Sequence, residues 1–227
     1  MRFTRRLALL APAAFALLAA APRKGRPKPR PAPPPPAPPI GDVERVELVT
    51  ELGSIIAVIN VKQAPITGTN FIRYVDQKRF DGVTFYRAMR LAWGEQPNGL
   101  IQAGTRGDPK RVLPAIAHEP TNVTGILHKA GTLSMARYAP GTATGDFSIM
   151  LSDLAGLDAD PSATDPELQA GYAAFGQVES GMDVARAIFD APISQTEGEG
   201  ALRGQMLAKP VRIISARRLP AAPPTSS

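Results

Sequence analysis

An arginine and a glutamine, each inside an apolar and strand-like run, are the residues of this chain best suited to chemistry. Arg87 ends the run Val83-Thr84-Phe85-Tyr86-Arg87, and Gln102 lies within Leu100-Ile101-Gln102-Ala103-Gly104. A charged donor held in a dry site stabilises charge that develops on a bound substrate. By itself, however, an arginine in a strand is most often exposed and paired with a carboxylate. A glutamine beside a turn commonly bonds the local main chain, so the surroundings must decide both roles.

The sequence lacks the residues that other common kinds of catalytic centre require. The chain has no cysteine and only two histidines, His118 and His128. His118-Glu119 begins like a zinc-protease motif, but Asn122 stands where the second histidine belongs and Pro120 would interrupt the helix. The sequence contains neither a Gly-x-Ser-x-Gly motif nor a phosphate-binding loop. We therefore expect no metal, nucleotide or other cofactor, and we interpret His128 as structural.

The net charge of +6 is concentrated at the start of the chain. Eight basic residues precede the first acidic residue, Asp42, so the remainder carries −2. Nucleic acid selects for basic surfaces. We therefore expect residues 42–227 not to bind nucleic acid.

Residues 1–21 have the layout of a secretory signal peptide. Three arginines precede an apolar run over 7–21 that ends in three alanines. This run is shorter than the roughly 20 residues that span a bilayer, so we predict a signal peptide, with an uncleaved inner-membrane anchor as the alternative. Residues 22–41 form a Pro-rich basic linker, expected to be a disordered tether because proline supports neither a helix nor a sheet interior. Its charge offers weak contact with the cell envelope.

Residues 42–219 are predicted to form one domain, followed by a disordered tail over 220–227. Alternating or β-branched segments predict strands, at 43–49, 53–59, 83–88, 100–103, 132–136, 147–151, 173–178 and 211–219. Two helices are predicted, one opened by Ala64-Pro65 and one over 181–189. Short strands with Gly-containing turns and few helices favour an all-β barrel or sandwich.

Three segments in this order resemble the cyclophilin-type peptidyl-prolyl isomerases: Val83-Thr84-Phe85-Tyr86-Arg87, Ile101-Gln102-Ala103-Gly104 and Gly131-Thr132-Leu133-Ser134-Met135-Ala136-Arg137. The resemblance spans roughly residues 46–218. It implies a mainly β fold, a closed eight-stranded antiparallel β-barrel capped by two α-helices. It also marks 90–98 and 159–171 as insertions, which we expect to be surface loops.

The resemblance implies that Arg87 and Gln102 are catalytic. Arg87 would donate to the proline carbonyl and approach the proline nitrogen, which weakens the amide resonance, while Gln102 would hold the substrate backbone. The residues implied to contact substrate are Phe85, Tyr86, Met135, Ala136, Arg137, Asp146, Ser148, Leu157 and Tyr172. Strand alternation predicts that Phe85 and Arg87 share one face and that Tyr86 lies on the other.

Five positions depart from the residues usual in the family. Tyr86 stands for histidine, Arg137 for asparagine and Asp146 for glutamine, while Ser148 and Gly99 replace two phenylalanines of the proline pocket. An aromatic side chain brings roughly 150–250 Å² of buried surface, so these two losses matter.

Two hypotheses address the altered pocket. In the first, Trp93, the only tryptophan, folds back from the 90–98 insertion and refills it. In the second, the pocket is shallow and polar, and an ion pair with Asp146 draws Arg87 away from substrate.

We therefore predict a monomeric peptidyl-prolyl cis-trans isomerase, periplasmic or secreted, that acts on X-Pro bonds of exported polypeptides and assists their folding. Its activity is expected to be reduced by the departures at Gly99, Asp146 and Ser148. The alternative is a weak or inactive envelope module that binds proline-containing peptides as a chaperone. A third reading is an envelope structural protein whose basic spacer is the working part.

Overall fold

The computed structural model describes residues 37–220. The predicted signal peptide, the linker as far as residue 36 and the tail from residue 221 lie outside the described residues. Within 37–220, no helix is both long and apolar enough to cross a membrane.

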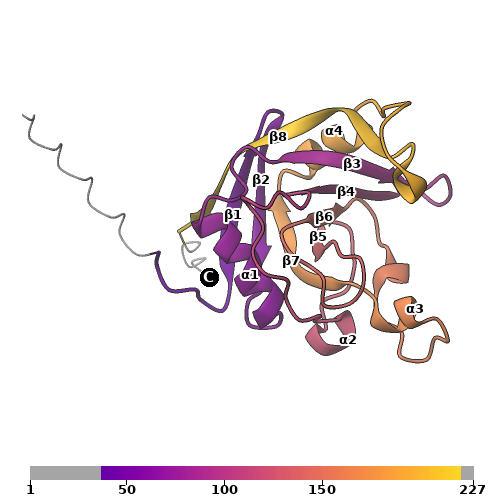
Figure 1. Cartoon of the computed structure of the whole chain (residues 1–227). Helices are drawn as coiled ribbons and strands as arrows, with labels where there is room; N and C mark the ends of the chain where they lie inside the picture. The colour runs from indigo at the N-terminus through magenta and orange to yellow at the C-terminus, as the bar shows by residue number, and fades with distance from the viewer. Residues whose placement is uncertain (1–36, 221–227) are drawn as a thin grey trace, which may run out of the picture. The chain divides into compact units, whose positions relative to one another are not determined.

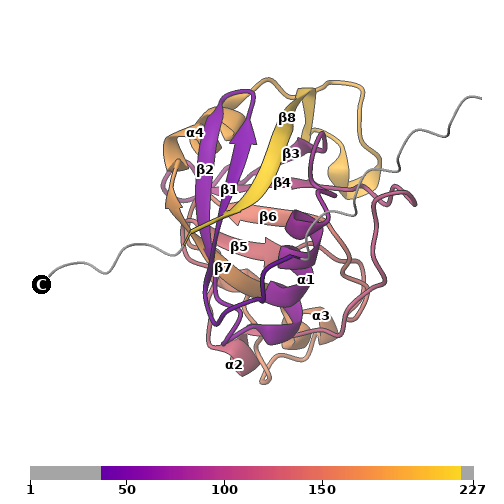
Figure 2. The same ribbon diagram turned by 90° about the vertical axis from the view of Figure 1, so that its left-hand side faces the viewer.

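Eight antiparallel strands close into a barrel in the order β1-β2-β7-β5-β6-β4-β3-β8 (Figures 1 and 2). The strands are β1 (Glu44–Thr50), β2 (Gly53–Ile59), β3 (Thr84–Arg90), β4 (Gly99–Gly104), β5 (Thr132–Met135), β6 (Phe147–Met150), β7 (Ala173–Ser180) and β8 (Met206–Leu219). The predicted closed barrel is confirmed, and closure leaves no sheet edge unpaired. β8 begins five residues earlier than the predicted 211, because Met206 already pairs with β3 opposite Arg87.

A cluster of phenylalanines fills the barrel. The Phe147 ring lies 5.2 Å from Phe71, 5.3 Å from Phe80 and 6.1 Å from Phe85, measured between ring centroids. Each such pair contributes about 0.5–1.5 kcal/mol beyond the area that it buries. Phe71 belongs to α1 (Pro65–Asp76), so the same cluster fixes this helix to the strands.

The two longer helices, α1 and α4 (Met182–Asp190), lie at opposite ends of the barrel (Figures 1 and 2). Pro65 occupies the first turn of α1 as predicted, but Ala64 has no side chain that could cap the helix. The buried Glu119 does so instead, because its carboxylate accepts the N–H groups of Ile66 at 3.1 Å and Thr67 at 2.8 Å. The carboxylate of the apparent zinc-protease motif is therefore a helix cap.

Two shorter helices were not predicted: α2 (Thr121–Thr124) and α3 (Pro166–Ala170). The expectation that 159–171 is wholly loop is therefore wrong. Asp165 caps α3 by accepting the Glu167 N–H at 2.8 Å, and Pro166 occupies its first turn. Two 3₁₀ turns, η1 (Ala155–Leu157) and η2 (Gly200–Leu202), complete the described elements.

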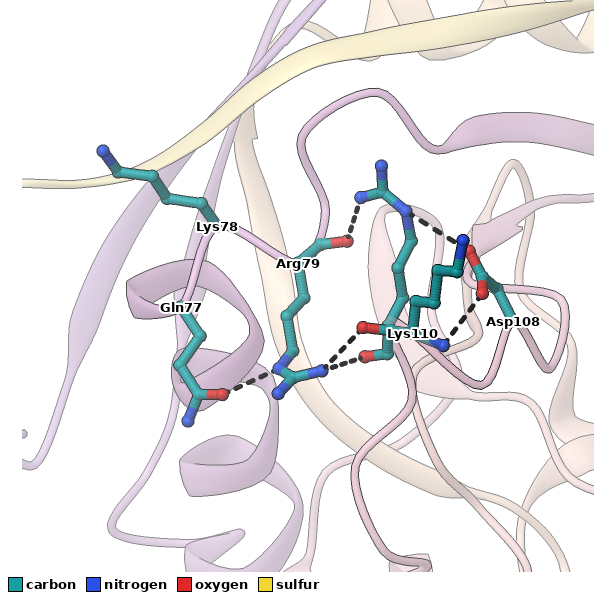
Figure 3. Close-up of a pocket in the computed structure, with 6 residues that line it drawn as sticks. Gln77, Lys78, Arg79, Asp108 and Lys110 are labelled. Atoms are coloured by element: carbon teal, nitrogen blue, oxygen red, sulfur yellow. Dashed lines mark hydrogen bonds and ion pairs between the residues drawn. The ribbon is translucent and has the colours of Figure 1, made fainter.

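Two arginines tie the loop after β4 to the end of α1 (Figure 3). Arg79 donates to the carbonyl oxygen of Arg111 at 2.8 Å, and Arg111 donates to the carbonyl oxygens of Arg79 at 3.0 Å and Asp81 at 2.7 Å. The exchange borders a surface hollow of about 420 Å³. It anchors the loop whose first residues, 105 and 106, reach the site described next.

Candidate active site

A β-bulge in β3 brings Tyr86 and Arg87 to the same side of the sheet. The register with β4 and β8 shifts between Phe85 and Arg87. Phe85 and Ala88 lie in the barrel core, whereas Tyr86 and Arg87 both hydrogen-bond to Gln102. The predicted sharing of one face by Phe85 and Arg87 is therefore wrong, because strict alternation fails where a strand carries an extra residue.

Gln102 is the centre of a directed chain of hydrogen bonds on the outer face of the barrel. Its side chain faces outward because the residues on either side of it in β4 belong to the core. Its Oε1 accepts from Arg87 Nη1 at 2.7 Å, and its Nε2 donates to the Tyr86 hydroxyl at 2.6 Å. The Tyr86 hydroxyl in turn donates to Asp146 Oδ1 at 3.0 Å. These partners fix which end of the amide faces the guanidinium.

Asp146 is the acceptor at the end of this chain. It also accepts the backbone N–H of Arg106 at 3.0 Å and the hydroxyl of Thr105 at 3.4 Å. Burial raises the pKa of Asp146, while these hydrogen bonds act in the opposite direction. Burial and the Asp146 carboxylate both raise the pKa of Tyr86 well above its ordinary value, so the phenol remains a donor. Among the described residues Arg87 bonds to Gln102 and Gln205 and forms no ion pair with Asp146, whose partner is the Tyr86 hydroxyl. The expectation that an ion pair with Asp146 draws Arg87 away from substrate is therefore wrong.

Arg87 has a second neutral partner that the sequence did not reveal. Its Nε donates to Gln205 Oε1 at 2.8 Å, just before β8 begins. Burial lowers the pKa of Arg87, whereas the neighbouring phenols of Tyr86 and Tyr172 raise it. An arginine side chain stays charged in proteins, so two amides hold a positive donor without neutralising it.

An apolar cluster adjoins this donor on the outer face. It consists of Leu100, Met150 and Leu154, with Met89, Leu91 and Leu157 packed against them, and we call it the outer apolar cluster. Met89 lies two residues beyond Arg87 in β3 and Leu100 two residues before Gln102 in β4, so period-two alternation places them beside the site. Among the described residues this cluster has no aromatic member.

The first hypothesis about the altered pocket is also wrong. Trp93 is 67% exposed and does not belong to the outer apolar cluster. Gly99 cannot carry a pocket side chain, since a Cβ there would lie 1.9 Å from the carbonyl oxygen of Met89. The conformation at Gly99, with a φ of +144°, likewise favours glycine.

The family model for the cyclophilin type peptidyl-prolyl cis-trans isomerases matches residues 45–218. The chain belongs to this family. It is 37% identical over 174 residues to a peptidyl-prolyl cis-trans isomerase of Acinetobacter baylyi, covering 75% of this chain and 82% of the relative. It is 32% identical over 176 residues to peptidyl-prolyl cis-trans isomerase A of Dickeya dadantii, covering 76% and 83%. Together these findings identify the chain as a peptidyl-prolyl isomerase.

Solved cyclophilins share its fold at low sequence identity. A Cryptosporidium parvum cyclophilin type isomerase matches with a TM-score of 0.57 and 17% identity, covering 79% of this chain and 99% of that one. A structure of the same parasite protein in the presence of the dipeptide Ala-Pro gives a TM-score of 0.55 and 18% identity, covering 76% and 97%.

The structure of this cyclophilin divides the remaining predicted site residues into two groups. Phe85 and Met135 pack in the barrel core, so the substrate contact predicted for their side chains is corrected: strand geometry turns both inward. Ser148 pairs with Gln102 across β4 and β6 and faces the site. Ala136 is half-buried beside it and donates its N–H to the carbonyl oxygen of Asp146 at 2.9 Å.

Three predicted residues approach from the segment after β6 and from the end of β5. Leu157 packs against the outer apolar cluster. The Arg137 guanidinium lies 4.5 Å from the centroid of the Tyr172 ring, and Tyr172 affects the pKa of Arg87. Around Arg87 the structure therefore gathers Tyr86, Gln102, Ala136, Arg137, Asp146, Ser148, Leu157 and Tyr172, with Gln205 added.

His128 links β5 to the segment that carries Leu157. Its Nδ1 lies 2.7 Å from Asp158 Oδ1, and its Nε2 lies 2.8 Å from Ser134 Oγ. The three groups resemble a hydrolytic triad, but Ser134 is 1% exposed within a strand and is closed to substrate. Burial lowers the pKa of His128 despite the opposing Asp158 carboxylate. Over residues 37–220, no group of three or more metal-ligating side chains comes together.

Proposed function

We propose that Arg87 is the catalytic group of this isomerase and that its substrates are X-Pro bonds of exported polypeptides that are still folding. The observation that carries the proposal is the arrangement of Arg87, a half-buried positive donor held by Gln102 and Gln205, beside the outer apolar cluster. The resting guanidinium spends two N–H groups on these amides, and its remaining donors are the ones we assign to substrate.

Isomerisation requires loss of amide resonance. The barrier to rotation is about 18–20 kcal/mol because the C–N bond has partial double-bond character. In our proposal Arg87 donates to the proline carbonyl and approaches the proline nitrogen as it becomes pyramidal, while Gln102 aligns the donor and the substrate backbone. A donor fixed before the reaction contributes a few kcal/mol in a site shielded from water, and each 1.4 kcal/mol or so is tenfold in rate. The proline ring rests on the outer apolar cluster.

A short proline-containing peptide is the substrate class best supported. The Ala-Pro dipeptide accompanies a cyclophilin of the same fold. In this chain the Met and Leu side chains of the outer apolar cluster offer an adaptable surface for a proline ring. Uncatalysed X-Pro isomerisation takes tens to hundreds of seconds, so a catalyst would speed the folding of exported chains.

A protease-coupled assay on an Ala-Pro peptide tests the proposal. Arg87→Ala should lower kcat/KM by about 10²–10³, while Arg45→Ala should leave it unchanged. Arg45 is a matched control because it also lies in a barrel strand, and it pairs with Glu179. If Arg87→Ala keeps the wild-type rate, Arg87 is not the catalytic group.

A weakly catalytic peptide-binding module is the second candidate, favoured by Ser148 and by an outer apolar cluster without aromatic rings. It predicts that the wild type binds the peptide but barely accelerates its isomerisation. Measuring the peptide Kd and the rate on one preparation separates the two candidates.

We also propose that residues 1–21 direct export, so that the protein acts in the periplasm or the medium. The protein would act there as a monomer, with weak envelope contact through the basic linker. Fractionation of cells and the intact mass of the exported protein test the leader and distinguish a cleaved signal from a retained anchor. Deleting 22–36 tests the linker: unchanged envelope association would leave it only as a tether. We expect a monomer, which size-exclusion chromatography would show as elution at the monomer mass.

A further inference from the structure

Arg137 lies two residues after the end of β5, and its side chain is only 1% exposed. Its Nη1 donates to Glu167 Oε2 at 2.8 Å and to the carbonyl oxygen of Tyr138 at 2.8 Å. Its Nη2 donates to the carbonyl oxygen of Gly171 at 2.6 Å. The guanidinium also stacks over the ring of Tyr172 at 4.5 Å. One side chain thus contacts four residues, three of them in the segment 167–172.

The segment that Arg137 contacts is the end of the 159–171 insertion. At Gly171 the two ends of the insertion meet, since a Cβ there would lie 2.4 Å from the backbone nitrogen of Ala159. Tyr172 then donates its N–H to the carbonyl oxygen of Leu157 at 2.8 Å. The insertion is therefore a closed loop, and Arg137 joins its base to the strand that borders the site.

Two observations relate Arg137 to the catalytic group. The Tyr172 phenol, whose ring the Arg137 guanidinium covers, raises the pKa of Arg87. Ala136, the residue before Arg137, donates its N–H to the carbonyl oxygen of Asp146, at the end of the hydrogen-bond chain from Arg87. Arg137 thus stands between the insertion and the site.

Holding Arg137 in this position is energetically unfavourable in one respect. The Nε of Arg137 is buried with no hydrogen-bond partner, and burying an unpaired donor is unfavourable. Among residues 37–220 the one carboxylate paired with this charge is that of Glu167, and the Glu167 side chain is 57% exposed. A planar cation stacked on the Tyr172 ring explains the choice of arginine, since lysine supplies neither the stack nor the forked donors.

We propose that Arg137 is a positioning residue that holds Tyr172 and the 159–171 insertion against the substrate-binding edge and thereby sets the affinity for the peptide. It acts through the Tyr172 ring and the Gly171 carbonyl and does not itself contact the X-Pro bond that rotates. The inference rests on the proposed role of Arg87, but its test measures the peptide Kd, whereas the test of Arg87 measures the catalysed rate.

Direct titration of a short Ala-Pro peptide tests the inference. Arg137→Lys should raise the peptide Kd and the KM about 3- to 10-fold and change kcat less than twofold, because the free protein must then order the loop on binding. Glu167→Gln should reproduce part of the rise, about twofold. Both variants keep a polar side chain, so they provide the test even if Arg137→Ala does not fold.

Arg90→Lys is the matched control. Arg90 also stacks on an aromatic ring, that of Phe189 at 5.5 Å, and donates to the carbonyl oxygen of Ala191 at 2.6 Å, but it grips the end of α4. Its replacement should leave the Kd unchanged even if the Tm falls. An unchanged Kd in Arg137→Lys, or an equal rise in Arg90→Lys, overturns the inference.

The two proposals fail separately. Loss of activity in Arg87→Ala together with a wild-type Kd in Arg137→Lys would reject only the positioning role. Wild-type activity in Arg87→Ala would reject the catalytic assignment, while the Kd of Arg137→Lys would still decide how the insertion is held.

Discussion

The Tyr86 hydroxyl donates to Asp146 Oδ1 over 3.0 Å, and both residues stand where the chain departs from its family. The two departures support each other: the phenol donates a hydrogen bond, and the half-buried carboxylate accepts it. Through Gln102 this pair orients the acceptor of Arg87. A network of this kind is coupled, so its members should not contribute independently.

We predict that Asp146→Ala and Tyr86→Phe each lower kcat/KM about 3- to 10-fold and that the double variant loses little more. Either change frees the Gln102 amide to turn away from the guanidinium. The measurement is a double-mutant cycle on isomerase activity. Multiplicative losses would show that the two residues act separately.

Gln205 should matter through its neutrality. Gln205→Ala removes the acceptor of Arg87 Nε and should lower kcat about 3- to 10-fold, with little change in KM. Gln205→Glu should lose more activity than Gln205→Ala, because a carboxylate would neutralise the donor that substrate requires. Gln77→Glu, an exposed change at the end of α1, serves as the control. Equal activity in the two Gln205 variants would contradict this account of the charge.

Stability should fall in mildly acidic solution because of His128. Burial lowers its folded pKa, so the folded state prefers the neutral ring while the unfolded chain takes up a proton near pH 6.5. The stabilisation is therefore complete above that pH and is lost as the pH falls below it, by up to about 1.4 kcal/mol per pH unit, until the folded pKa is reached. Urea unfolding between pH 8 and pH 5 should give a steeper decline for the wild type than for His128→Gln. Parallel curves would remove His128 as the cause.

Glu119 should stabilise α1 from outside the helix. Glu119→Ala leaves the N–H groups of Ile66 and Thr67 without their acceptor and should lower the free energy of unfolding by about 1–2 kcal/mol. Glu95→Ala, in an exposed loop, should have almost no effect. A wild-type unfolding curve for Glu119→Ala would mean that water caps the helix as well as the carboxylate does.

Strand periodicity predicted the strands, and the resemblance of three short motifs to the cyclophilins predicted the closed barrel, which the structure confirms. The same motifs singled out Arg87 and Gln102, which the structure joins by a hydrogen bond. The sequence was insufficient where one extra residue changed the pairing: the bulge after Phe85 placed Arg87 on the side of Tyr86 and not on the side of Phe85. It also missed Gln205, which lies 118 residues from Arg87 along the chain and meets it only through the pairing of β8 with β3. The short α3 could have been predicted, because Asp165-Pro166-Glu167 is a typical helix start: a capping aspartate followed by proline and an acidic residue in the first turn.

Exchange between the cis and trans forms of an Ala-Pro peptide, followed by NMR at equilibrium, tests the central claim most directly, because one sample reports both binding and the catalysed rotation. We predict that the wild type accelerates exchange and that Arg87→Ala still binds the peptide but is slower by a factor of about 100 or more. Equal acceleration by the two proteins would contradict a catalytic guanidinium at position 87.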